Sequence, residues 1–242
     1  MEAASYFKEE IMVVQHNLRA MNSNRMLGVT TATQSKSTEK LSSGYKVNRA
    51  ADDAAGLAIS EKMRRQIRGL TQASLNAQDG ISCVQTAEGA LAEVHDMLQR
   101  MNELAVKAAN GTQMSEDRAY IDSEVQALKT EINRVANSTT FNEKMLLDGT
   151  FTNTNLQVGS ESGNTIAVSI AAMNAQGISI ADVTVSAEDK AGEGIDKIKK
   201  ALAAVSKQRS DLGAIQNRLE HTVKNLDNIV ENTTAAESQI RD

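Results

Sequence analysis

The sequence predicts a mainly α-helical protein: a long antiparallel helical bundle, or coiled coil, with a small β-hairpin region. The first observation behind this prediction is an apolar seam that repeats every seventh residue, with a second apolar residue three positions after each. The second is the absence of proline and an aromatic content of 2%, which suits long, closely packed aliphatic helices. The third is a change to alternating polar and apolar residues between positions 141 and 187. The seam consists of Val84, Leu91, Leu98 and Ala105, followed by Ala87, Val94, Met101 and Ala108.

The first eleven residues of the chain differ in character from the rest. A new pattern begins at Met12, and the preceding Lys8, Glu9 and Glu10 would be encoded by purine-only codons that resemble a ribosome-binding tract. We therefore interpret residues 1–11 as an N-terminal extension, or as sequence upstream of a biological start at Met12.

A first helix is expected from Val14 to about Lys40, although its apolar residues are sparse. Such a helix has little apolar surface to offset its ordering entropy, so it is marginal by itself. Gly44 is the residue type expected just after a helix end, and Tyr45 to Gly56 reads as a connection. Residues 12–55 therefore form one helix and its connector.

The apolar seam predicts one long helix that ends near Asn110. It extends backward through Leu70, Ala73 and Ala77, so a helix of about fifty residues, roughly 75 Å in length, is expected. Residues 56–150 contain this helix and a shorter one, and form the N-terminal half of the bundle.

The shorter helix is expected between Ser115 and Asn137. Ser115 is a suitable N-cap, and Glu116 and Asp117 suit the positive end of the helix dipole. Its apolar residues alternate steps of four and three. The tight loop after Asn110 folds this helix back antiparallel to the long one.

Residues 151–190 are predicted to form short β-hairpins. Their apolar residues alternate with polar ones, and glycines separate the runs. The alternating apolar residues are Leu156, Val158, Ile166, Val168, Ile170, Ile178, Ile180, Val183 and Val185.

The helical period returns at Ile195, so residues 191–242 form the C-terminal half of the bundle. The heptads are still running at Asp242, without a glycine or proline that would stop a helix. This predicts that the natural helical pattern continues beyond Asp242.

The charge balance argues against nucleic acid as a partner. The net charge is −5 and the pI is about 5.4, so the short basic run from Lys62 to Arg68 is interpreted as a solvated helix face. No apolar run reaches the roughly 18 residues of a membrane span, and no signal peptide opens the chain, so membrane insertion is not expected. The single cysteine, Cys83, flanks the seam and should be buried.

No catalytic, metal or cofactor site is predicted. The three histidines lie far apart, and no phosphate-binding loop, nucleophile elbow or Cys-x-x-Cys pair is present. Asp52 and Asp53 could hold a divalent cation, but two carboxylates directly before a helix are more often caps. An enzyme is therefore not expected.

Arg100 is the residue that points most clearly to a binding surface. With Leu98 and Met101 in the seam, Arg100 projects outward, and Leu104 lies one turn along at the seam's edge. This pair is either a solvated face with one flanking leucine or a protein-binding anchor, since an exposed arginine beside an apolar residue is common at interfaces.

Several blocks of sequence resemble bacterial flagellin, in the order in which that family has them. The resemblance covers Met12 to about Leu147 and Gly194 to Asp242. The blocks are LSSGYKVN at 41–48, DDAAGLAIS at 52–60, GLTQAS at 69–74, NAQDGIS at 76–82, EGAL at 88–91, QR at 99–100 and ELAV at 103–106. Between the last two, Asn102 stands where the family often has arginine.

The resemblance implies a secreted subunit of the flagellar filament, exported through the flagellar channel. Residues 12–55 would then contribute the helix of the filament core, and residues 151–190 would be the variable region, here without large outer domains. The implied partners are other flagellin subunits, the export chaperone and the filament cap. A final helix that pairs with the N-terminal one would follow Asp242, and this chain without it would not make filaments.

The resemblance also implies recognition by Toll-like receptor 5 of a vertebrate host. In many flagellins the stretch that matches Gln99 to Val106 makes this contact. The implied receptor-binding residues are Gln99, Arg100, Glu103, Leu104 and Glu124.

Two other functions fit part of the pattern. A hook-filament junction protein shares the terminal regions but normally diverges through the blocks between residues 41 and 82. A chemoreceptor-like signalling coiled coil is also alanine-rich, but it would need a membrane span or sensor domain, and the sequence shows neither.

Overall fold

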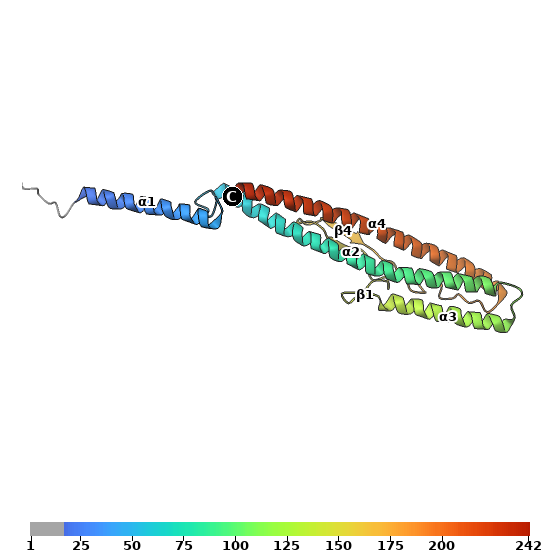
Figure 1. The fold of residues 1–242 in the computed structure, drawn as a ribbon. Helices are drawn as coiled ribbons and strands as arrows, with labels where there is room; N and C mark the ends of the chain where they lie inside the picture. The colour runs from blue at the N-terminus through green and yellow to red at the C-terminus, as the bar shows by residue number, and fades with distance from the viewer. Residues whose placement is uncertain (1–16) are drawn as a thin grey trace, which may run out of the picture. The chain divides into compact units, whose positions relative to one another are not determined.

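The computed structural model describes residues 17–242, and the expectations for residues 1–11 and Met12 lie outside this range. Four helices and two small hairpins make up the described chain, which confirms the mainly α-helical class (Figure 1). In chain order the elements are α1 (Leu18–Ser43), α2 (Ala54–Ala108), α3 (Ser115–Ser138), β1 (Thr140–Phe141), β2 (Lys144–Met145), β3 (Thr154–Gln157), β4 (Thr165–Val168) and α4 (Glu188–Arg241).

The contacts divide the described chain into two compact units. One comprises the residues up to Met63 together with Ala235–Asp242, and the other is Arg64–Thr234. This division rests on spatial contacts and does not address the segment boundaries expected from the sequence, which remain predictions.

The larger unit is built on the antiparallel pair of α2 and α4, which run side by side in Figure 1. The predicted seam is its core: Leu91, Leu98 and Met101 of α2 have no exposed surface, and Leu212 of α4 is equally buried. Polar pairs flank the seam, since the Arg209 guanidinium of α4 lies 2.8 Å from Glu88 of α2. The seven-residue repeat therefore predicted both the helices and the faces by which they pack.

The helix α3 folds back along α2, as the tight loop predicted, and buries Ile121, Val125 and Ile132. Its N-cap is Met114, one residue before the Ser115 that the sequence favoured. The Asp117 carboxylate explains the difference, because it accepts the Met114 backbone N–H at 3.2 Å and so caps the helix from its third position.

The hairpin prediction is correct for only part of residues 151–190. Strands β3 and β4 pair antiparallel, with Leu156 opposite Ile166. This hairpin lies so close to α2 that a Cβ on Gly80 would be 2.4 Å from Leu156 Cδ1, so a larger residue there would require the Leu156 side chain to move. The small hairpin of β1 and β2 was missed, since two residues per strand give no periodic signal.

Residues 178–185 form turns and irregular chain instead of the predicted hairpin. Ile178, Ile180, Val183 and Val185 are nevertheless buried, so the alternation marks one buried side of the chain and does not require backbone pairing with a second strand. Side chains of α3 take the place of a partner strand.

The contacts between α3 and this segment run along one face of the helix, at steps of three and four residues. Asp122 Oδ1 accepts the Val185 N–H at 2.7 Å. Lys129 Nζ donates to the carbonyl oxygens of Ala181 and Val183 at 2.5 and 3.1 Å. The backbone groups of the segment are thereby paired without a second strand.

In the smaller unit, α1 ends as expected at Gly44, which has a left-handed φ of 73°. No residue of α1 is buried, in agreement with its sparse apolar pattern. The connector after Gly44 binds the end of α4: the N–H groups of Lys46 and Val47 donate to the Arg241 carbonyl, at 2.7 and 3.1 Å. Asp53 caps α2 by accepting two backbone N–H groups, which confirms its expected role.

Candidate functional site

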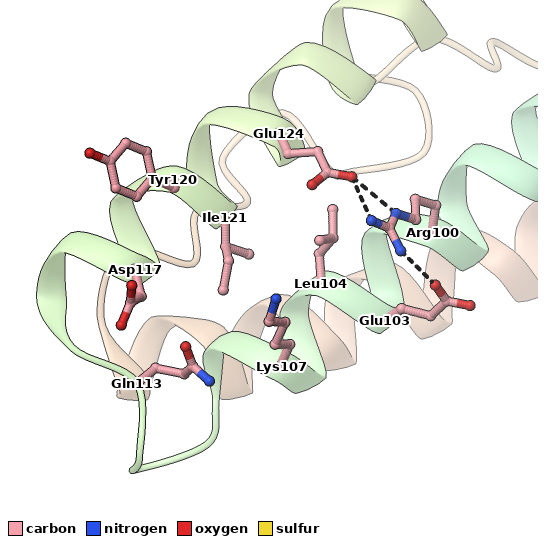
Figure 2. Close-up of a pocket in the computed structure, with 9 residues that line it drawn as sticks. All are labelled: Arg100, Glu103, Leu104, Lys107, Gln113, Asp117, Tyr120, Ile121 and Glu124. Carbon is pink, nitrogen blue, oxygen red and sulfur yellow. Dashed lines mark hydrogen bonds and ion pairs between the residues drawn. The ribbon is translucent and has the colours of Figure 1, made fainter.

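A groove of roughly 350 Å³ lies between the C-terminal part of α2 and the first half of α3, within the larger unit. Figure 2 shows the two helices as its walls, with the turn between them closing one end. The residues that line it are Arg100, Glu103, Leu104, Lys107, Gln113, Asp117, Tyr120, Ile121 and Glu124.

Two carboxylates hold the guanidinium of Arg100 in place at the mouth of the groove. Its Nε and Nη2 both lie against Oε1 of Glu124, at 3.0 and 2.9 Å, and its Nη1 donates to Glu103 at 3.1 Å (Figure 2). The hydrogen bonds from Glu124 and then Glu103 raise the pKa of Arg100 above its ordinary value. The side chain is still 52% exposed, so two carboxylates fix the direction of an accessible cation.

Leu104 is more buried than expected for a leucine at the edge of a solvated helix face. It is only 4% exposed and belongs to the main core cluster, as does Ile121 across the groove. The two side chains form the apolar floor of the groove, with Leu104 the nearer of the two to Arg100 (Figure 2). A third helix causes the difference, because α3 covers a face of α2 that a two-helix seam would leave open.

The rim contains residues that were not predicted from the sequence. Lys107 lies one turn beyond Leu104 on α2, and Asp117 and Tyr120 lie on α3, with Tyr120 77% exposed. The sequence contained part of the information needed to find them: by helical spacing, positions 100, 104 and 107 share one face of α2, and positions 117, 121 and 124 share one face of α3. Only the fold shows that the two faces meet.

Arg118 fixes the turn that closes the groove. Its Nε donates to the Ala108 carbonyl at 2.9 Å, and its Nη2 donates to the Asn110 carbonyl at 3.3 Å. The same Nη2 lies 3.4 Å from Glu188 at the start of α4. This arginine therefore satisfies free carbonyl groups at the end of α2 while it connects three elements.

Gln99 is the one residue of the predicted set that does not line the groove. Its side-chain amide lies 2.9 Å from His95 Nε2, one turn earlier on α2. Arg100, Glu103, Leu104 and Glu124 are brought together as a single site.

Metal binding and the reactivity of the single cysteine are separate properties of the described residues. Residues 17–242 contain no group of three or more histidine, cysteine, aspartate or glutamate side chains placed to bind a metal ion. Burial raises the pKa of the Cys83 thiol, which disfavours its reactive thiolate form. Among the helices of the same range, none combines the length and apolar character that a membrane crossing requires.

Two family regions match the chain. Residues 14–152 match the bacterial flagellin N-terminal helical region, and residues 195–242 match the bacterial flagellin C-terminal helical region. The chain is 53% identical to a flagellin of Halalkalibacterium halodurans, over 96% of this chain and 86% of that protein. It is 46% identical to a flagellin of Bacillus subtilis, over 96% of this chain and 87% of that protein.

Two solved structures resemble this chain, one of a flagellin and one of a different flagellar protein. The crystal structure of Bacillus cereus flagellin matches with a TM-score of 0.57 at 30% identity, over 63% of this chain and 88% of that one. A putative flagellar hook-associated protein from Vibrio parahaemolyticus matches with a TM-score of 0.66 at 15% identity, over 79% of this chain and 100% of that one. The second match shows a shared fold alone.

Proposed function

This chain belongs to the bacterial flagellin family, and from that premise we propose that the groove at Arg100 is a recognition surface for Toll-like receptor 5 of a host. As a flagellin, the chain is a structural subunit of the flagellar filament, and it is not an enzyme. It is exported as a component of the bacterial flagellum, and membership of the family implies polymerisation with other flagellin subunits. The expectation that filament formation needs a further helix after Asp242 stays a prediction.

The two alternatives are not favoured. The hook-associated protein has the same fold at low identity, so the fold does not separate junction proteins from filament subunits. The sequence relatives do, because proteins named flagellin match 96% of this chain at up to 53% identity. These matches also leave no reason to assign a signalling coiled coil.

The observation that supports receptor recognition is the geometry of Arg100. Its guanidinium is more than half exposed, but contacts with Glu103 and Glu124 hold it in one direction. A cation that is ordered before binding loses less side-chain entropy when a partner contacts it. An arginine above an apolar floor is also typical of residues that dominate interfaces.

The other predicted residues then have different roles. Glu103 and Glu124 orient Arg100 and can accept hydrogen bonds at the rim, and Gln99 extends the surface toward His95. Leu104, being buried, supports the groove from below and shapes it. The export chaperone and the filament cap are further proposed partners, supported by family membership and without an assigned surface on this chain.

A titration of the receptor ectodomain against the full chain and its variants tests the proposal. Arg100→Ala should weaken binding by about fivefold or more, the loss expected when an interface anchor is truncated. Glu124→Gln should weaken binding less, because it removes the charge that orients the arginine and keeps the arginine itself.

Arg134→Ala is the matched control. Arg134 is an exposed arginine of the larger unit, on α3 with its own carboxylate partner, Glu131, and it lies outside the groove. Its loss should leave receptor affinity unchanged. Equal affinities for the Arg100 and Arg134 variants would reject the groove as the receptor contact, and would leave membership of the flagellin family unaffected.

A further inference from the structure

The turn between α2 and α3 contains the only Asn-Gly step in the sequence, Asn110-Gly111. Both residues lie after the end of α2 at Ala108 and before α3 begins at Ser115, and Gly111 is exposed. Glycine has no Cβ, so its backbone nitrogen can approach the preceding side chain with little steric hindrance. The step therefore combines an amide side chain in a surface turn with an unhindered backbone neighbour.

The hydrogen bonding of the turn leaves this pair free to react. The Asn110 side-chain oxygen accepts the Thr112 N–H at 3.4 Å, which keeps the side chain folded along the following backbone. Within residues 17–242, no hydrogen bond occupies the Gly111 N–H. The backbone nitrogen next to the Asn110 amide is thus not held by another acceptor.

Three asparagines in other turns and loops, Asn48, Asn164 and Asn174, are placed differently. In each of them, the N–H of the next residue donates to an oxygen, which fixes that nitrogen away from the side chain. Arg49 after Asn48 donates to Asp52 at 3.1 Å, Thr165 after Asn164 donates to Gly163 at 2.9 Å, and Ala175 after Asn174 donates to Asn133 at 2.9 Å. Asn110 therefore differs from these three asparagines in the hydrogen bonding of the next backbone N–H, and this difference is additional to the effect of the glycine.

We propose that Asn110-Gly111 is a site of spontaneous covalent modification, at which the asparagine becomes aspartyl and isoaspartyl. The Gly111 nitrogen, after losing its proton, attacks Cγ of Asn110, and a new C–N bond closes a five-membered succinimide ring. The Cγ–Nδ2 bond breaks, and the nitrogen leaves as ammonia with the proton it gains from solvent. Water then adds to one of the two ring carbonyls, and the bond between that carbon and the ring nitrogen breaks. Attack at the side-chain carbonyl gives an aspartyl residue with the ordinary backbone, and attack at the backbone carbonyl gives an isoaspartyl residue whose backbone runs through the side-chain carbon.

The modification would reach the groove through Arg118. The Asn110 carbonyl accepts the N–H of Gln113 at 3.1 Å and Nη2 of Arg118 at 3.3 Å, and Gln113 lines the groove. In the isoaspartyl product the main chain gains one carbon and the Asn110 backbone carbonyl becomes a free carboxylate, whereas in the aspartyl product the side-chain amide becomes the carboxylate. Both products therefore add a negative charge near the Arg118 guanidinium. Gradual chemical change at one turn therefore alters the closed end of the groove. This inference does not depend on the identity of the partner that binds there.

Incubation of the folded full chain at neutral and mildly alkaline pH, followed by peptide mapping with mass spectrometry, tests the proposal. Asn110 should convert first, with release of ammonia and an isoaspartyl product, and faster at higher pH because the attacking nitrogen must lose a proton. Gly111→Ala should slow the conversion by about tenfold or more, since the added Cβ hinders attack and raises the barrier. Asn110→Gln should abolish the early product.

Unfolding in urea separates the contribution of structure from that of sequence. The rates at Asn48, Asn164 and Asn174 should rise when their hydrogen bonds are lost, and the rate at Asn110 should change little. Conversion of Asn110 no faster than these three in the folded chain, or a large acceleration of Asn110 on unfolding, would overturn the proposal.

Discussion

Arg100 directs two of its nitrogens, Nε and Nη2, at a single oxygen of Glu124, and so connects α2 to α3 across the mouth of the groove. Both side chains are about half exposed, at 52% and 46%. Ion pairs in such positions contribute little to stability, because water screens them and both side chains lose entropy. The main effect of this ion pair is therefore to orient the Arg100 guanidinium, and its effect on the stability of the fold is small.

The first prediction follows from this exposure. Arg100→Ala, Glu124→Ala and the double variant should all unfold at nearly the same urea concentration as the parent chain. A double-mutant cycle should give a small coupling free energy that falls further as salt is added. A large, salt-independent coupling would show that the pair stabilises the fold, and would weaken the interpretation of Arg100 as a residue held ready for a partner.

The second prediction concerns the core beneath this surface. Leu98 has no exposed surface and lies at the centre of the seam of α2, so Leu98→Ala should reduce the free energy of unfolding by about 2–5 kcal/mol. Chemical denaturation monitored by circular dichroism measures it, with Arg100→Ala as the surface comparison. Similar stabilities for these two variants would mean that the seam has been placed on the wrong face of α2.

The sequence predicted the larger elements because their signals are local and repeated. Leu98 and Leu212 mark faces that recur over many heptads, so small local exceptions do not change the pattern. Leu104 could not be placed by the same rule. It lies outside the two seam positions of the heptad, and it is buried because α3 packs there, which depends on a contact between separate helices.

The segment from residue 178 to residue 185 was mispredicted for a related reason. Alternating apolar residues are expected wherever one side of an extended chain is buried, whether or not a partner strand is present. Here Asp122 and Lys129 supply the hydrogen bonds, and neither lies near the segment in sequence. The groove itself was not predicted. Helical spacing placed Arg100 and Leu104 on one face of α2, and Glu124 was singled out only through the family resemblance, so the meeting of the two helices was not part of the prediction.

The third prediction tests Arg118, which the sequence did not single out. Arg118→Met keeps much of the side-chain length but leaves the carbonyl groups of Ala108 and Asn110 without this donor. Because the side chain is only 13% exposed, the loss should cost about 1–3 kcal/mol. Arg118→Lys should recover part of the loss by donating to one carbonyl, and an unchanged stability for Arg118→Met would show that water replaces the arginine fully.

The fourth prediction is a pH dependence at Lys129. Burial lowers the pKa of Lys129 below its usual value of 10.5, against the opposing charges of Asp122 and Asp182. The unfolded chain then holds this proton more tightly than the folded chain does. The contribution of Lys129 to the free energy of unfolding should therefore rise as the pH increases from the folded pKa to 10.5, and should level off above it.

Denaturation of the parent chain and of Lys129→Met over this pH range isolates the effect. The difference in unfolding free energy between the two chains should change with pH in the stated direction, because the methionine cannot titrate. A difference that is constant with pH would mean that the oxygens around the ammonium group, those of the Ala181 and Val183 carbonyls and the Gln126 side chain, fully offset its burial. Lys190→Met, which alters an exposed lysine of α4, provides the control for a general charge effect.

The last prediction concerns α1, in which no residue is buried. Its backbone amides bond only within the helix along most of its length, and an isolated helix of this kind gains little from side-chain packing to offset the entropy of ordering. Local opening should therefore cost little free energy, and hydrogen exchange should be fast from Leu18 to Thr38. The amides from Val84 to Ala108 should exchange slowly, since the α2 side chains there pack into the core of the larger unit.

The connector after α1 provides an internal comparison. The N–H groups of Lys46 and Val47 donate to the Arg241 carbonyl, and they should be better protected than the amides in the middle of α1. Strong protection throughout α1 in dilute solution would show that this helix buries a face against another molecule, and dilution to lower protein concentration would then reduce that protection.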